Sequence, residues 1–249
     1  MTFDRHPAPV REPRRAARRA LRHAVHNART ALAAACVVTA AAALGGCASP
    51  PSRFYTLNPG DTTVPTIANP SLLIELAPVD MPSQVAKNQF VVQRSATQVD
   101  VLEQERWASL PGDEVRHALS GDLAQRLGTI DVYGAPHPDG VPVYRISVNV
   151  QRFESWPGSH ALIDAVWSVH SMRTQSVMTC RSVVSEPVGA GYGQLVVGHR
   201  RAVQALSASI AAGVRALAQA TPAAGGAHPV APAVPCPAPV PAPADAAAD

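Results

Sequence analysis

The chain has 249 residues and a mass of 26.0 kDa, with 16% charged and 47% hydrophobic side chains. This length and composition suit one ordinary domain with appendages and exclude a chain that is disordered throughout. The formal net charge of +3 comes from the leader, because residues 1–46 carry eight arginines against Asp4 and Glu12, a balance of +6. The rest of the chain holds 13 basic and 16 acidic groups, a balance of −3, which disfavours binding to a phosphate backbone.

The first 46 residues have the three zones of a secretory signal. An arginine-rich stretch ends at Arg29, an apolar segment covers residues 31–44, and a small-residue site, Leu44-Gly45-Gly46-Cys47, follows. The apolar segment has fourteen residues, which suits the core of a signal peptide, whereas a helix that spans a bilayer needs about 20. An uncleaved anchor is therefore disfavoured. Twin-arginine export is also disfavoured, because arginine pairs are expected in so basic a leader.

Leu44-Gly45-Gly46-Cys47 resembles the lipobox of bacterial lipoproteins, in which the cysteine thiol takes a diacylglycerol and the chain is cut just before it. We expect residues 1–46 to be removed as a lipoprotein signal peptide and Cys47 to become the lipidated first residue. The alternative, a buried cysteine after an alanine-rich core helix, leaves the preceding arginines unexplained. Each buried acyl methylene contributes about 0.8 kcal/mol, so more than one acyl chain anchors stably. Ala48 stands where an inner-membrane retention signal would place Asp, so the resemblance implies the outer membrane.

The predicted domain covers residues 47–220 and begins with short strands. Apolar segments bounded by turn residues predict these strands at residues 54–57, 72–76, 90–93 and 99–102. Apolar side chains then recur every fourth residue from Val115, which predicts an amphipathic helix over residues 113–127, closed by Gly128. The first half of the domain is therefore predicted to be β-rich, with one helix at its end.

Strict alternation of apolar and polar residues predicts two antiparallel strands, at 144–151 and 161–169. A type II turn at Trp156-Pro157-Gly158-Ser159 joins them, because Pro presets the first central φ and Gly accepts the positive second one. A further strand at 178–184 extends this meander. An apolar stripe from Val196 to Leu217, which includes His199, predicts a long helix that packs on the sheet.

This order of elements predicts an α+β fold: a single domain with a mostly antiparallel or mixed sheet and two main helices packed on one face. Residues 221–249 contain 8 prolines and 11 alanines. Such a composition cannot bury a core, so we expect a disordered tail with polyproline character.

Patterns that carry chemistry are missing from the sequence. No cysteine or histidine cluster has zinc spacing. Lys87, the single lysine, follows no glycine-rich loop, which excludes a P-loop and disfavours a Schiff-base enzyme. Residues 189–193 resemble half a dinucleotide loop but lack its third glycine, so a strand-to-helix loop is the better interpretation, and Glu103 and Glu105 are expected to form a solvated polar face. We therefore predict no catalytic residue, metal or cofactor.

Two of the four cysteines belong to the domain and the tail. Cys36 lies in the leader and Cys47 at the lipidation site, which leaves Cys180 and Cys236. A disulfide between them is possible in an oxidising compartment. Because Cys236 lies in a segment predicted to be unstructured, we expect instead that Cys180 is an unpaired, small strand residue.

Several segments in a fixed order resemble the PqiC family of auxiliary lipoproteins. They are Cys47, Arg53-Phe54-Tyr55-Thr56-Leu57, Leu76-Ala77-Pro78-Val79, Arg106-Trp107-Ala108-Ser109-Leu110, and Arg152-Phe153-Glu154 followed by Ala165-Val166-Trp167. The similarity covers residues 47–218. The resemblance implies an outer-membrane lipoprotein on the periplasmic face that performs no catalysis. On this reading it docks an MCE-domain (PqiB-like) protein and its inner-membrane transporter and supports lipid transfer between membranes. The resemblance leaves open whether the protein forms a homo-oligomer.

We predict that Arg106, Trp107 and Trp156 contact this partner, because an exposed tryptophan flanked by arginine is a common hot spot. The alternative for Trp107 is a place in the core beside the first helix, and Trp167 is assigned to the core outright. A second hypothesis for the function is a periplasmic lipoprotein that activates a cell-wall enzyme by binding it. The proline-rich tail would then serve to reach that enzyme.

Overall fold

The computed structural model describes residues 22–33, 50–58, 67–220 and 235–238. It divides into two units, Met1–Pro50 and Pro51–Asp249, and each is described by itself. In the first unit, residues 22–33 form an exposed helix. Cys47, and most of the apolar segment before it, lie outside the described residues. None of the helices that the structure describes is long and apolar enough to cross a membrane.

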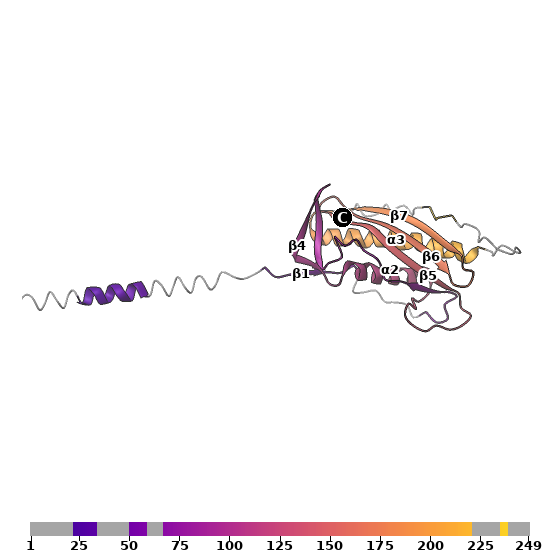
Figure 1. The fold of residues 1–249 in the computed structure, drawn as a ribbon, viewed down its shortest axis with the longest axis horizontal. Coiled ribbons are helices and arrows are strands. Elements are labelled where there is room, and N and C mark those ends of the chain that lie inside the picture. The colour runs from indigo at the N-terminus through magenta and orange to yellow at the C-terminus, as the bar shows by residue number, and fades with distance from the viewer. Residues whose placement is uncertain (1–21, 34–49, 59–66, 221–234, 239–249) are drawn as a thin grey trace, which may run out of the picture. The chain divides into compact units, whose positions relative to one another are not determined.

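The second unit is built on a large, mixed sheet with the strand order β2-β5-β6-β7 (Figure 1). Its strands are β2 (Leu73–Leu76), β5 (Val143–Trp156), β6 (His160–Ser171) and β7 (Val177–Pro187). β5, β6 and β7 form the predicted antiparallel meander, and β2 joins β5 in parallel. The turn between β5 and β6 also agrees with the sequence: Gly158 has φ +68°, and the Ser159 amide donates to the Trp156 carbonyl at 3.0 Å.

A smaller sheet has the order β1-β4-β3. Its strands are β1 (Arg53–Tyr55), β3 (Gln89–Ser95) and β4 (Gln98–Trp107). β3 and β4 form an antiparallel hairpin, while β1 pairs with β4 in parallel. β4 is much longer than the predicted strand at 99–102, because a register shift beside Gln89 and Phe90 lets it bend and continue to Trp107. The bend brings the end of β4 beside β1.

Two helices cover one face of the large sheet, as predicted. α2 (Pro111–Leu127) begins with a proline in its first turn and ends at Gly128, whose φ of +62° is the left-handed value that favours glycine. α3 (Tyr192–Gln219) follows the glycine-containing loop after β7, which confirms the loop interpretation of that segment. α3 packs against β6 and β7, and α2 packs against α3 (Figure 1). The domain is therefore α+β.

Trp107 occupies the core where the two sheets and α3 meet. Its side chain is 2% exposed and stacks on Phe90 of β3 with ring centroids 4.4 Å apart. Phe153 of β5 and His199 of α3 contact its edge at 6.0 and 6.2 Å. Trp167 is also 2% exposed, as predicted. The core alternative for Trp107 is thus the one that the structure supports.

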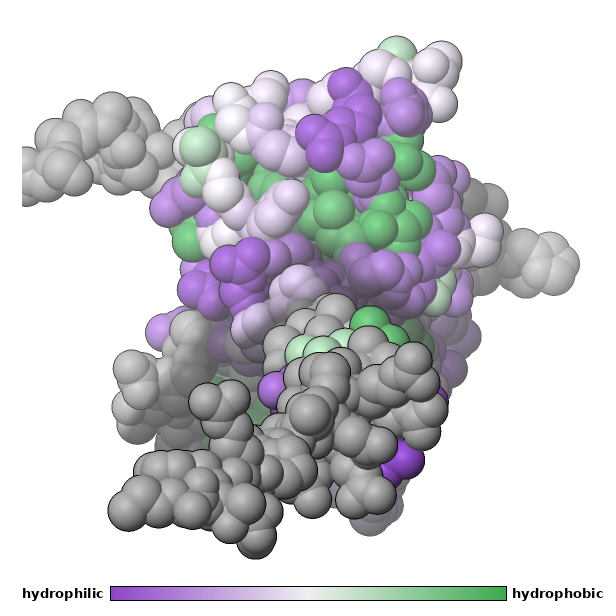
Figure 2. All heavy atoms as spheres, turned by 90° about the vertical axis from the view of Figure 1, so that its left-hand side faces the viewer, coloured by the Kyte–Doolittle hydropathy of each residue, from purple (hydrophilic) through white to green (hydrophobic). Residues whose placement is uncertain are grey.

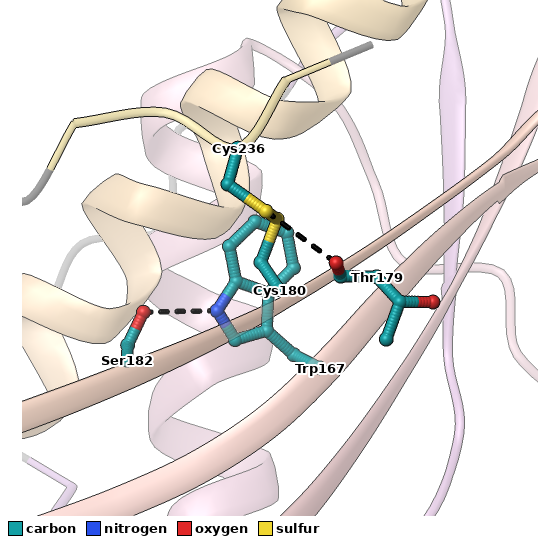
Figure 3. Close-up of a disulfide and its surroundings, with 5 residues drawn as sticks. All are labelled: Trp167, Thr179, Cys180, Ser182 and Cys236. Carbon is teal, nitrogen blue, oxygen red and sulfur yellow. Dashed lines mark hydrogen bonds between the residues drawn. A yellow bond between two sulfur atoms is a disulfide. The ribbon is translucent and has the colours of Figure 1, made fainter. Parts of the chain in front are cut away.

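Cys180 and Cys236 form a disulfide, so the prediction of an unpaired Cys180 is wrong (Figure 3). Cys180 lies on β7, the edge strand of the large sheet, directly opposite Trp167 of β6. Cys236 Sγ lies 3.4 Å from the Thr179 carbonyl oxygen. The prediction failed because a proline-rich segment does not need a fold of its own to bring a thiol to a strand edge within its reach. The sixteen residues between Gln219 and Cys236 can span more than 50 Å at about 3.3 Å per residue.

His199 is a fully buried histidine with no charged partner. Its Nε2 lies 2.8 Å from the Ser155 hydroxyl, its ring stacks on Phe153 at 4.0 Å, and its Nδ1 has no hydrogen-bond partner among the residues that the structure describes. Burial lowers the pKa of His199 from 6.5 to about 3. The imidazole therefore stays neutral in the folded domain at every physiological pH.

We predict that this burial makes the domain less stable in mild acid. Between pH 6.5 and about pH 3 the unfolded chain binds a proton at His199 and the folded chain does not, so the free energy of unfolding falls as pH falls. From pH 7 to pH 5.5 the loss from this residue is about 1 kcal/mol. Urea denaturation of the wild type and of His199→Gln at pH 7 and pH 5.5 measures this loss in the free energy of unfolding. An equal acid response in the two proteins would contradict the prediction.

Candidate functional site

A β-bulge in β5 sets up the site that contains Trp156. Along the first part of β5 the even-numbered side chains, such as Val148 and Val150, point into the core. The register with β6 shifts between Val150 and Arg152, so one extra residue enters the strand. After it the odd-numbered Phe153 and Ser155 point inward. Bulges re-aim side chains in this way, and here the bulge turns the next even-numbered residues outward.

Arg152, Glu154 and Trp156 therefore share one outward face and form a hydrogen-bonded chain. Arg152 donates from Nε and Nη2 to the two Glu154 oxygens at 2.7 and 3.0 Å, and Trp156 Nε1 donates to Oε2 at 3.0 Å. These bonds, that of Arg152 foremost, hold the pKa of Glu154 below its usual value. His160 stacks against the Trp156 ring with centroids 5.6 Å apart. The half-buried indole is thus fixed from two sides.

This chain lines a hollow of about 530 Å³ beside the tip of the β3–β4 hairpin. The other lining residues, mostly small or amide-bearing, are Gln84, Gln93, Ala96, Thr97, Gln98 and Val99. The hollow has the size of a ligand or peptide-binding site. Its one cation and its one anion neutralise each other, so its lining offers hydrogen bonds and an aromatic surface without net charge. It suits a neutral polar segment better than a phosphate or a carboxylate.

Arg106 lies at the other end of the hairpin, away from this hollow. It pairs through its backbone register with Gln89 of β3 and with Phe54 of β1, while Gln98 at the hollow is eight residues back along β4. Its Nε donates to the Glu103 carbonyl at 2.8 Å, and its side chain is 37% exposed. The structure therefore does not bring Arg106 and Trp156 together, and the exposed aromatic residue beside Arg106 is Phe54.

The prediction of a solvated face at Glu103 and Glu105 is correct for Glu103 only. Glu105 is 5% exposed, and its carboxylate accepts bonds from Arg53 Nε at 2.9 Å and from the Tyr55 hydroxyl at 2.7 Å. Burial, together with this bond to Glu105, raises the pKa of Tyr55 to about 12. A sequence pattern cannot reveal this burial, because both partners lie about fifty positions away in β1.

A second buried carboxylate, Glu114 in the first turn of α2, binds the segment after β1. It accepts bonds from the Thr56 hydroxyl and the Leu57 amide at 2.8 Å, and from the Ser109 hydroxyl and amide at 2.6 and 3.1 Å. Desolvation alone would raise its pKa, but these bonds outweigh burial and the pKa lies below its usual value. Arg200 of α3 donates to the Leu57 and Thr56 carbonyls at 3.0 and 3.2 Å. The start of the domain is therefore clamped by both helices.

Within the parts of the chain that the structure describes, no group of three or more His, Cys, Asp or Glu residues has the arrangement of a metal site. The fully buried His199–Ser155 pair has no access to a substrate. What the site offers is a neutral hollow with a fixed tryptophan, and a clamped first strand that carries exposed side chains.

The fold is that of a single α+β domain with one helix-covered sheet, and a fold of this class does not by itself define a function. Residues 55–211 match the family described as ABC-type transport auxiliary lipoprotein component, and the chain belongs to this family. The family contains PqiC-like lipoproteins, which confirms the resemblance seen in the sequence. No curated protein sequence matches the chain.

Two solved structures share the fold at low sequence identity. One, an uncharacterized protein, has a TM-score of 0.53 and 18% identity, with 66% of this chain and 99% of that chain covered. The other, from Xanthomonas campestris, has a TM-score of 0.50 and 15% identity, with 64% and 92% covered. At this identity the likeness concerns the fold alone.

Proposed function

We propose that the protein is an outer-membrane lipoprotein, anchored on the periplasmic face through Cys47, and a non-catalytic accessory subunit of an MCE-type intermembrane lipid transport system. The observation that carries the proposal is the family match over residues 55–211, which begins eight residues after the lipobox-like Leu44-Gly45-Gly46-Cys47. The family supplies the class, an auxiliary lipoprotein of ABC-type transport, and the leader supplies the anchor.

The periplasm-spanning MCE-domain partner docks in the hollow beside Trp156. A tryptophan held by the Glu154 hydrogen bond and by His160 loses little side-chain entropy on binding, and such pre-organised aromatic residues dominate interface energies. The amide side chains around it can hydrogen-bond an extended segment of the partner. Arg152 and Glu154 complete the wall without adding net charge.

Lipidation is tested by growth with an alkyne-bearing fatty acid, followed by coupling to a dye and separation of the inner and outer membranes. Cys47→Ser should lose the label and leave the membrane fraction. Cys36→Ser, a matched change in the leader, should keep both. A labelled protein that sediments with the inner membrane would overturn the location, and an unlabelled wild type would overturn the anchor.

Docking is tested with a photo-crosslinking amino acid at Gln98 in cells. We predict crosslinks to an MCE-domain protein, and a binding loss of at least about tenfold for Trp156→Ala, the size of an interface hot spot. Tyr133, which is 45% exposed and does not line the hollow, is the matched control for both the crosslinker and the alanine substitution. Crosslinks at Gln98 that never include an MCE-domain protein would contradict the proposal.

The alternative function, activation of a cell-wall enzyme with the tail as a reaching arm, is disfavoured by the disulfide. Cys236 fastens the tail to β7 and so shortens its reach. Deletion of residues 237–249 should therefore leave the transport function unchanged.

A further inference from the structure

The proposed anchor leaves the first strand little freedom to move away from the bilayer. Phe54 of β1 is the seventh residue after Cys47. A fully extended chain spans at most about 3.5 Å per residue, so Phe54 lies within about 25 Å of the lipidated sulfur. This inference rests on the lipidation of Cys47 proposed above.

Phe54 is a large apolar side chain presented to solvent on a rigid backbone. It is 66% exposed, although β1 is paired with β4 along its whole length. The clamp described above fixes the residues on its C-terminal side through Glu114 and Arg200. An exposed phenylalanine on a fixed strand marks an interaction surface more strongly than one in a loose loop, because ordering it on binding costs little.

Two arginines flank Phe54. Arg53 precedes it in β1, with a side chain that is 69% exposed, and Arg106 is its register partner on β4. Arg53 uses Nε and Nη2 on Glu105, and Arg106 uses Nε on the Glu103 carbonyl while its Nη2 lies 3.7 Å from the Glu103 carboxylate. A guanidinium has five N–H donors, so each arginine keeps further donors beyond these contacts. An apolar ring between two such groups matches a bilayer interface, where arginines bind phosphates and rings reach the acyl boundary.

More apolar surface lies at this end of the domain. Figure 2 views the end that carries β1 and β4 and shows an apolar area framed by polar side chains. Two further exposed apolar residues belong to the elements that bind the segment after β1: Leu110, just before α2, and Val197, in the second turn of α3. Their exposures of 38% to 45% are moderate, which fits a surface that rests on a bilayer without deep insertion.

We propose that the β1 end of the domain is a membrane-contact face, with Phe54 inserted at the headgroup–acyl boundary and Arg53 and Arg106 on lipid phosphates. A tethered domain with such a face has a defined orientation on the membrane. The hollow at the hairpin tip lies eight residues back along β4 from Arg106, so the bilayer and a partner in the hollow would contact different parts of the hairpin.

The first test uses the full lipidated protein in vesicles of phosphatidylethanolamine and phosphatidylglycerol. Phe54→Trp should show tryptophan emission that is quenched when the lipids carry bromine on their acyl chains. Val177→Trp, a change at another exposed apolar residue, at the start of β7, should show no quenching beyond that of the native tryptophans. A labelled, vesicle-bound protein without quenching at position 54 overturns this inference and leaves the anchor standing. A protein without the lipid label overturns the anchor itself.

The second test separates the membrane from a second copy of the chain as the occupant. In the mature chain with Cys47→Ser, the additional change Phe54→Ser should lower the vesicle partition coefficient about tenfold, the value of one buried aromatic side chain. Val177→Ser should leave it unchanged. A Phe54→Ser protein that shifts from oligomer to monomer in sedimentation while its partition coefficient stays the same would overturn the proposal. Circular dichroism of each variant verifies that the domain is folded.

Discussion

Replacing Gly198 by alanine should lower the free energy of unfolding by about 2 kcal/mol, although alanine is the better helix former. Gly198 is buried in α3 where this helix crosses β6. A Cβ atom there would lie 2.3 Å from Val188 Cγ1 and 2.9 Å from the Ala161 Cβ. Neither neighbour can swing away, because a valine is stiff at χ1 and an alanine has no rotamer. The helix or the strand must therefore shift. This overpacking costs about 3 kcal/mol, and the higher helix propensity of alanine offsets about 1 kcal/mol of it.

Gly193 is the matched control, because it lies in the same helix but has space for a side chain. It lies in the first turn of α3, and a Cβ there would meet nothing within 4 Å. Gly193→Ala should be neutral or stabilise the domain by up to about 1 kcal/mol. Urea denaturation followed by far-ultraviolet circular dichroism measures both variants. Equal midpoints for the two would show that α3 does not approach β6 as closely as the structure has it.

The elements could be predicted where one period of hydrophobicity holds throughout. β5 alternates strictly from Tyr144 to Gln151, and apolar residues recur every fourth position in the helix that ends at Gly128, so both patterns report directly on burial. The α+β class followed from their order. The extension of β4 to Trp107 could not be predicted from the sequence, because a bulge breaks the alternation and Glu105 faces inward to pair with Arg53.

The same limit explains the mixed outcome for the candidate contacts. Arg106 and Trp107 are neighbours in the sequence, and this pairing suggests a hot spot at the surface, with a core position of Trp107 as the alternative. Successive side chains of a strand point to opposite faces, so only one of the two can be at the surface, and the aromatic residue goes to the core. A signal for the site around Trp156 was present: Gln151 and Arg152 are two polar residues in succession within an alternating strand, the mark of a bulge. The partners of Glu105 and Glu114 are far apart in the sequence and needed the fold.

Glu114→Gln should be among the most damaging single changes, with a loss of about 3 kcal/mol. The Glu114 carboxylate is the acceptor for four hydrogen bonds that join α2 to the segment after β1. A glutamine of the same size keeps one acceptor oxygen and turns an amide group toward the remaining donors of Ser109, Thr56 or Leu57. Hydrogen bonds to a charged group contribute about 1.5–3 kcal/mol each, and leaving such donors buried and unpaired adds to the loss. The segment that carries the proposed anchor would lose its attachment to α2.

Asp113→Asn is the control, because Asp113 lies in the same turn but is exposed. Its charge only complements the helix dipole, at about 0.3–1 kcal/mol. The pH dependence distinguishes the two further. Because the pKa of Glu114 is lower in the folded than in the unfolded protein, its stabilisation is fully present above the ordinary value of 4.5 and is lost as the pH falls through the folded value. The stability gap between wild type and Glu114→Gln should therefore narrow on acidification below that value, whereas a gap that stays constant would show that Glu114 acts through packing alone.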